Sequence, residues 1–262
     1  MIKKTKIEGA VKVFPLYNGS VNLTFKESGH RYEIDGKEIV GVTTILKTVI
    51  AKEALINWAV KMTADHILAN FDPTKAYKPD EIVKLVDDAK KAHRLAKEGS
   101  ADIGTRAHKW IEEYIKAKIS GGMVPGKPEE DIKEPIKNFL VWEASNEVKW
   151  LESEKPVYSK KYGYCGTMDF MAIVNGSKVI GDIKTSNAIY PESYYLQVSA
   201  YRYAYEEEYN DAGISGMLII KIPKDNKSIL EVKSVPDYQD NATAFIYAVH
   251  LYRQVSKLKN FK

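Results

Sequence analysis

The sequence predicts an α/β protein whose core is a mixed β-sheet with helices on both faces. From about residue 102 onward, the expected order of elements is helix, three strands, helix, strand. Two apolar segments, GTMDFMAIV and VIGDIKTS, flank Asn175-Gly176, which is a strong signal for a two-residue hairpin. The composition, with 44% hydrophobic and 28% charged residues, is ordinary for a globular chain and argues against disorder.

Length, charge and cysteine content exclude several classes of protein. The 262 residues can bury one elaborated domain, or a domain with a small appendage. The net charge of +4 permits a polyanionic partner without demanding one. The single cysteine, Cys165, excludes an internal disulfide and a cysteine-held iron–sulfur cluster, and we expect it to be a small buried hydrophobe. No apolar run reaches membrane-spanning length, so we expect a cytoplasmic protein without a membrane partner.

Residues 1–100 are expected to form a β-hairpin and helical extension packed on the core. NLTF, HRYEI and EIVGVTTIL read as strands separated by the turn sequences ESG and DG. A helix should follow from about Lys52 to Ala69. A second helix should begin at Pro79-Asp80 and end at Gly99.

Residues 101–262 are expected to form the core domain. Asp102 could cap a helix that ends at Gly121-Gly122. The remaining elements should be, in order, a helix over 134–147, strands near 149–158, 164–174 and 178–185, a tyrosine-rich helix from Pro191 to about Glu208, a hairpin formed by MLIIKIP and ILEVKSV around KDNK, and a final helix carrying Phe245, Ile246 and Val249.

The hairpin around Asn175-Gly176 brings charged side chains together. Side chains alternate along a strand, so Asp182 and Lys184 should share one side while Ile183 points to the other. The turn would place the strand of Asp169 against the strand of Asp182. Two carboxylates beside an ammonium can hold a hard divalent cation and manage a nucleophilic water.

Each of these residues also has a plainer interpretation. Asp169 alone would more often be a turn or cap residue, and the trio with Asp182 and Lys184 could be a structural ion pair. The surrounding FMAIV would bury Asp169, however, and a buried carboxylate needs a partner, so the trio favours a metal site. His108 on an amphipathic helix would more often be a packing residue. The other histidines carry no motif and receive no role: His30, His66, His93 and His250.

Four motifs follow one another along the chain: GTRAH at 104–108, the Asp of GTMDF, Asp-Ile-Lys in GDIKTS, and Gln-(three)-Tyr in QVSAY. In this order they resemble the PD-(D/E)XK nuclease superfamily, and within it the RecB-type and phage-type exonuclease branch. The resemblance covers roughly residues 100–225. It implies a restriction-endonuclease-like core of the order αβββαβ.

The resemblance also implies roles for individual residues. Asp169 and Asp182 would be the metal-binding carboxylates, with the backbone carbonyl of Ile183 completing the shell. His108 would be an additional metal ligand. Lys184 would orient or deprotonate the attacking water and offset charge on the reacting phosphate.

Three further residues match positions near the site in this family. Gln197 and Tyr201 would contact the DNA strand or support the lysine; they lie four residues apart and share a helix face. Glu154 is a candidate for a further acidic residue. The expected cofactor is Mg²⁺ or Mn²⁺, since oxygen ligands with one imidazole suit both ions.

Together these points predict a metal-dependent DNA exonuclease that leaves 5′-phosphate ends, in phage or bacterial recombination or repair. DNA is the expected partner; a recombinase or single-strand-annealing protein and an oligomer are possible. A structure-specific endonuclease and a non-catalytic nucleic-acid-binding protein with this fold are the alternatives. The sequence leaves open the polarity of digestion, the strand preference and the oligomeric state.

Overall fold

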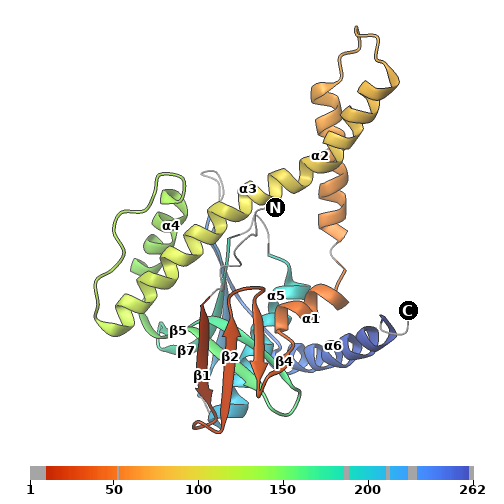
Figure 1. The fold of residues 1–262 in the computed structure, drawn as a ribbon. Helices are drawn as coiled ribbons and strands as arrows, with labels where there is room; N and C mark the ends of the chain where they lie inside the picture. Colours follow the sequence, from red (N-terminus) through yellow and green to blue (C-terminus); the bar gives the residue numbers. More distant parts are fainter. Residues whose placement is uncertain (1–9, 52, 186–188, 211–212, 224–228, 260–262) are drawn as a thin grey trace, which may run out of the picture.

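The computed structural model describes residues 10–51, 53–185, 189–210, 213–223 and 229–259. They form two β-sheets and a set of helices, which confirms a mixed α/β protein (Figure 1). The elements are β1 (Val11–Leu16), β2 (Val21–Lys26), β3 (Arg31–Ile34), β4 (Lys37–Ile39), α1 (Val42–Val49), α2 (Glu53–Asn70), α3 (Pro79–Ser120), α4 (Lys133–Ala144), β5 (Val148–Ser159), β6 (Tyr164–Val174), β7 (Ser177–Lys184), α5 (Pro191–Tyr209), β8 (Gly216–Lys221), β9 (Glu231–Ser234) and α6 (Tyr238–Lys259).

The larger sheet has five strands in the order β5-β6-β7-β8-β9. β5, β6 and β7 are antiparallel, β8 runs parallel to β7, and β9 is antiparallel to β8. The expected hairpin is confirmed: Val174 pairs with Ser177, and Asn175 and Gly176 both have positive φ, as a type I′ turn requires. β8 and β9 pair as expected, but the turn KDNK between them lies outside the described residues.

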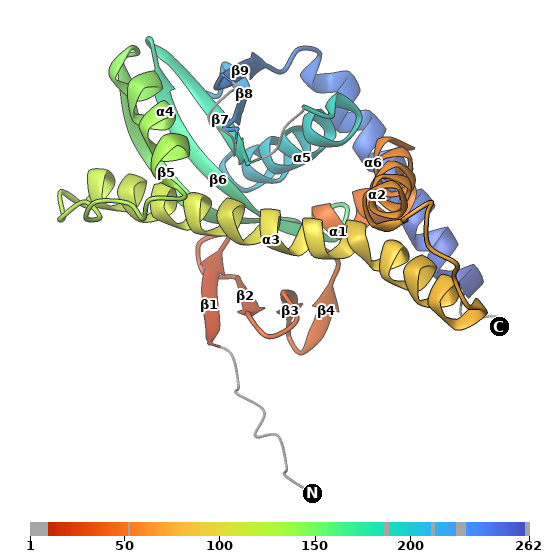
Figure 2. The same cartoon turned by 90° about the horizontal axis from the view of Figure 1, so that it is seen from above.

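Helices cover both faces of the five-stranded sheet. On one face α1, α5 and α6 pack against side chains such as Met168 and Ile180. On the other face α3 and α4 pack against side chains such as Phe170 and Ile183. Seen from above, α3 crosses over the junction of the two sheets (Figure 2). None of the helices in the described part of the chain is long and apolar enough to cross a membrane.

The N-terminal strands form a separate antiparallel sheet, in the order β1-β2-β3-β4, in which β2, β3 and β4 match NLTF, HRYEI and the start of EIVGVTTIL. A backbone bridge joins it to the larger sheet, because the Cys165 amide donates to the Val40 carbonyl at 3.1 Å. The Tyr17 hydroxyl donates to the Tyr158 carbonyl at 2.8 Å, and the Tyr17 amide donates to Glu208 at 2.7 Å. Cys165 is buried between the two sheets, as its sequence context indicated.

Two helices expected on either side of Gly99 are one continuous helix, so the predicted break at Gly99 and cap at Asp102 are wrong. A glycine inside a helix costs only about 1 kcal/mol, and no proline stands nearby. The first half of α3 also packs along α2, forming a pair of helices that projects away from the sheets (Figure 1). The end of α3 at Gly121 is confirmed, where Gly121 adopts φ 68.

The segment VTTIL was expected to continue a strand, and this prediction is wrong as well. It forms α1, in which Val42, Ile45 and Leu46 are buried at helical spacing. Packing of this stripe against α5 and α6 outweighs the strand preference of the β-branched residues. β1 was not predicted; it tolerates Pro15 because it is an edge strand.

Gly181 lets the two central strands of the site pack closely. A Cβ atom at this position would lie 1.9 Å from Cζ of Phe170. The Phe170 ring is fully buried and meets the Trp150 ring edge-on, with 5.3 Å between centroids, so it has little room to move. The glycine of VIGDIK is therefore a packing requirement beside the charged residues.

Replacing Gly181 with alanine should lower the free energy of unfolding by about 1–3 kcal/mol, because the new methyl group overpacks the core. Urea unfolding followed by circular dichroism measures the effect. Gly126→Ala is the matched control, because nothing lies within 4 Å of the Cβ it would add. Equal stability of the Gly181→Ala variant and the parent protein would contradict this account of the packing.

Candidate active site

A cavity of about 300 Å³ lies where α3, β5, β6, β7 and α5 meet. Every residue that the sequence singled out lines it: His108, Glu154, Asp169, Asp182, Ile183, Lys184, Gln197 and Tyr201. These residues come from five elements that span about a hundred positions of the chain. The structure therefore brings together the whole set.

Asp169 lies where β6 separates from β7. The pairing of these strands extends only to Phe170 and Gly181, one residue short of Asp169 and Asp182. The Ile183 amide donates to Oδ2 of Asp169 at 2.6 Å instead. Although burial would raise it, the pKa of Asp169 lies below its usual value because His108, Lys184 and this amide all favour the carboxylate.

His108 reaches the same carboxylate from α3. Ala107 and Ile111 face the core, and Nε2 of His108 lies 3.0 Å from Oδ2 of Asp169. Burial disfavours the imidazolium, but the charge and hydrogen bond of Asp169 outweigh it and raise the pKa of His108 to about 9. The imidazole is thus mostly protonated at neutral pH in this arrangement.

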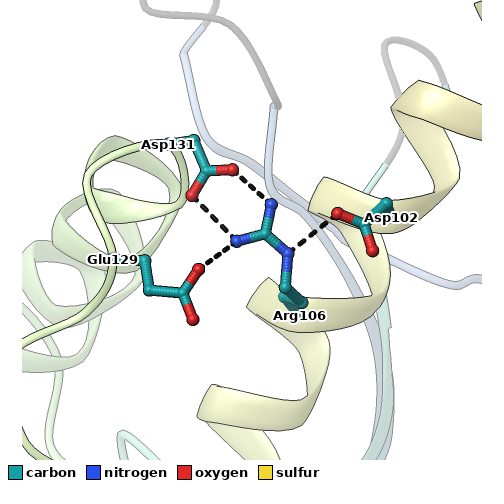
Figure 3. A network of polar contacts seen from close by, with 4 residues as sticks. All are labelled: Asp102, Arg106, Glu129 and Asp131. Atoms are coloured by element: carbon teal, nitrogen blue, oxygen red, sulfur yellow. Dashed lines mark hydrogen bonds and ion pairs between the residues drawn. The ribbon is translucent and has the colours of Figure 1, made fainter.

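Arg106, two residues before His108 on α3, ties this helix to the segment before α4 (Figure 3). Nε of Arg106 donates to Asp102 at 2.9 Å, and its Nη1 donates to Asp131 at 2.9 Å. Glu129 also pairs with the guanidinium. Asp102 thus contacts a side chain one turn later instead of capping a helix.

Glu154 lies on β5 across from Asp169, since its neighbours Ser153 and Lys155 pair with Phe170 and Met168. Its φ of 50° is in the left-handed region, which a non-glycine residue rarely adopts within a strand. Such strain costs on the order of 1–3 kcal/mol and is concentrated at functional sites. Burial and the nearby charge of Asp169 raise the pKa of Glu154 to about 8.

These three residues form a group that could hold a metal ion. One ligand atom each from His108, Glu154 and Asp169 lie within 4.8 Å of one another. Two carboxylate oxygens and one imidazole nitrogen form a donor set that suits a divalent cation. Glu154, held only as a candidate from the sequence, is thus placed among the potential ligands.

Asp182 lies in the same cavity but outside this group of three. Its Oδ2 pairs with Nζ of Lys184 at 2.5 Å, and its Oδ1 accepts a hydrogen bond from Gln197 at 3.0 Å. Gln197 also donates to the Tyr201 hydroxyl at 2.9 Å. Asp182 and Lys184 do share a side, and the ion pair that was the alternative interpretation is formed within the cavity.

Burial and the neighbouring charges oppose each other in setting the pKa values of this pair. Burial raises the pKa of Asp182 to about 6, opposed by the Lys184 ammonium and reinforced by Asp169. For Lys184 burial lowers the pKa, but the two carboxylates outweigh it, so its pKa lies above the usual value. Lys184 is therefore protonated at neutral pH in this arrangement. Its Nζ lies 5.0 Å from the centre of the Tyr194 ring.

Tyr201 is packed rather than exposed. Its ring lies so close to Gly166 that a Cβ there would be 2.5 Å from Cε1 of Tyr201. Tyr201 is 3% exposed and Gln197 7% exposed. This burial favours support of Asp182 over stacking on a base. The close approach of the ring also explains the glycine at position 166 of β6.

The N-terminal sheet and α1 supply part of the cavity wall that sequence reasoning missed. The additional lining residues include His30, Tyr32, Val42 and Thr43. The Tyr32 hydroxyl lies 2.9 Å from Oγ1 of Thr167, in the GTMDF strand. No local pattern could have found these residues, because only tertiary packing brings them to the site.

Comparisons with known proteins give the resemblance no further support. No model of a protein family matches the chain, and no curated protein matches it. The likeness to PD-(D/E)XK nucleases therefore depends on the order of the motifs. The convergence of their side chains in one cavity is an independent structural fact.

Binding of a divalent cation should release about two protons at pH 7, because His108 and Glu154 carry protons that a cation would displace. Because both pKa values are raised, protons compete with the cation for these two side chains most strongly at low pH. The affinity for the cation should therefore rise from about pH 6 to pH 9. Titration calorimetry with Mn²⁺, in buffers of different ionisation enthalpy, counts the protons. Cation binding to the His108→Ala variant should release one proton fewer. An affinity for Mn²⁺ that does not vary with pH would contradict this assignment.

Proposed function

We propose that this protein is a metal-dependent DNA exonuclease that hydrolyses phosphodiester bonds and leaves 5′-phosphate ends. The observation that carries the proposal is the convergence of His108, Glu154 and Asp169 beside the Asp182–Lys184 pair in one cavity. The element order, a helix followed by β5, β6, β7, α5 and β8, supports a restriction-endonuclease-like core. The parallel pairing of β7 with β8 across α5 agrees with that arrangement.

The donor set fits Mg²⁺ or Mn²⁺. Two carboxylates and an imidazole are ligands that both ions accept, and the imidazole favours Mn²⁺ somewhat. When bound, such an ion would polarise a phosphate oxygen and favour ionisation of the attacking water. His108, Glu154 and Asp169 would hold it. The Ile183 carbonyl and Asp182 stay proposed as further ligands, because both residues line the same cavity.

Charge balance supports this fit. The imidazolium of His108 and the ammonium of Lys184 offset the carboxylates of Asp169 and Asp182, while Glu154 is mostly protonated at neutral pH. Exchanging the protons of His108 and Glu154 for one divalent cation leaves the net charge unchanged. The cavity can therefore accept the ion without a large uncompensated charge.

Lys184 would act on the reacting phosphate. Asp182 fixes its ammonium, and Gln197 and Tyr201 fix Asp182 in turn. A held ammonium can orient the attacking water and stabilise negative charge that develops on the phosphate. The alternative role as proton acceptor requires the charge of a neighbouring cation to lower the pKa of Lys184.

Lys184→Ala should reduce Mg²⁺- or Mn²⁺-dependent release of nucleotides from linear DNA by at least about a hundredfold, while the fold and Mn²⁺ binding persist. Lys221→Ala is the matched control, because Lys221 is the register partner of Lys184 on β8 but pairs with Glu231 at 2.9 Å and does not line the cavity. Undiminished digestion by Lys184→Ala would refute the proposed role.

Covalently closed circular DNA separates the exonuclease from an endonuclease of the same fold. The protein should leave such circles intact and digest them only after linearisation, because an exonuclease needs a chain end. Agarose gels of matched circular and linear plasmid provide the measurement. Cutting of the circle would favour the endonuclease, and no digestion with any divalent metal would favour a non-catalytic nucleic-acid-binding protein.

A further inference from the structure

A second cavity of about 410 Å³ adjoins the candidate active site. The two cavities share His30, Tyr32 and Gly41 in their walls. The second cavity lies between the N-terminal sheet, the start of α1, the β5–β6 turn and α6. The two cavities therefore lie side by side against these shared residues.

Two guanidinium groups line the second cavity. Arg253 on α6 is held in place, because its Nη2 donates to the carbonyls of Tyr162 and Gly163. Arg31 on β3 is exposed and pairs with no carboxylate in the described part of the chain. Glu38 is the single carboxylate among the described lining residues, so positive charge prevails in the wall.

The first turn of α1 begins at the wall that the two cavities share. Gly41 is the N-cap, and its carbonyl accepts from the Thr44 and Ile45 amides. The first amides of a helix have no partner within it, and the helix dipole favours an anion there. Val42 and Thr43, which carry such amides, line the first cavity, whereas the Thr44 amide at the second cavity is already used. The second cavity therefore depends on its two guanidinium groups.

We propose that the second cavity binds another phosphate of the same polynucleotide strand, apart from the one that is cleaved. The inference rests on the proposed nuclease function and extends it to the path of the substrate. Arginine suits this task because its planar guanidinium can donate two parallel hydrogen bonds to a phosphate. The phosphate is either one of the backbone or a terminal one, since both offer the same oxygens.

Arg31→Ala tests the proposal with little risk to folding, because Arg31 is exposed and contributes no ion pair to the described structure. The variant should lower kcat/KM for a single-stranded oligonucleotide by about tenfold or more, through loss of a charged hydrogen bond. Hydrolysis of thymidine 5′-(p-nitrophenyl phosphate), which has one phosphodiester, should stay unchanged. Lys257→Ala on α6, which loses the same charge away from the cavity, should match the parent protein on both substrates.

Binding separates failure of this inference from failure of the nuclease proposal. Fluorescence anisotropy with a labelled oligonucleotide in Ca²⁺ needs no cleavage. Arg31→Ala should weaken binding, and the slope of log K against log salt should become smaller by about 0.7, as expected for one lost contact to a single strand. Arg253→Ala should weaken binding likewise. Thermal unfolding of this variant should be measured as well, because the substitution also removes the contact of Arg253 with the β5–β6 turn.

Substrates with and without a 5′-phosphate identify the phosphate. A penalty of Arg31→Ala that appears only with the 5′-phosphorylated strand assigns a terminal phosphate, and an equal penalty on both assigns a backbone phosphate. Oligonucleotide binding that is unchanged in Arg31→Ala, or absent in the parent protein, would overturn the inference. Binding that depends on Arg31 without any digestion would instead defeat the nuclease proposal alone.

Discussion

The carboxylate of Asp169 joins three elements at one point. Its strand, β6, separates from β7 here, and the side chain accepts the Ile183 amide of β7 while it contacts His108 of α3. Through this carboxylate, α3 is joined to the point where the two strands separate. The packing of Phe170 against Gly181 fixes where the strands begin to part.

The remainder of the site consists of buried charges that depend on one another. Asp182 is fully buried and would be costly alone, but its Oδ1 accepts a hydrogen bond from Gln197, and its Oδ2 has the charge of Lys184 at 2.5 Å although it accepts no hydrogen bond from the described residues. Because residue 166 is glycine, the Tyr201 ring can lie close to β6, where its hydroxyl accepts a hydrogen bond from Gln197. These contacts hold the side chains of Asp182, Gln197 and Tyr201 in fixed orientations.

Much of the core and its polar residues could be predicted from local patterns. The Asn175-Gly176 turn set the register of β6 and β7, and strand alternation placed Asp182 and Lys184 on one side. Continuity of α3 through Gly99 and the helical form of α1 could not be predicted, because packing against distant segments decides both. The part of the cavity wall around Tyr32 could not be predicted either, because Tyr32 and its partner Thr167 are 135 positions apart in the sequence.

The length of α3 has a mechanical consequence. Pro79, at its free end, lies 29 residues before His108, roughly 44 Å along a straight helix at 1.5 Å per residue. The projecting part of α3 and the turn that carries His108 therefore belong to one unbroken helix. Arg106 ties this helix to the segment before α4 two residues from the histidine, so the position of the imidazole depends on the placement of the whole helix.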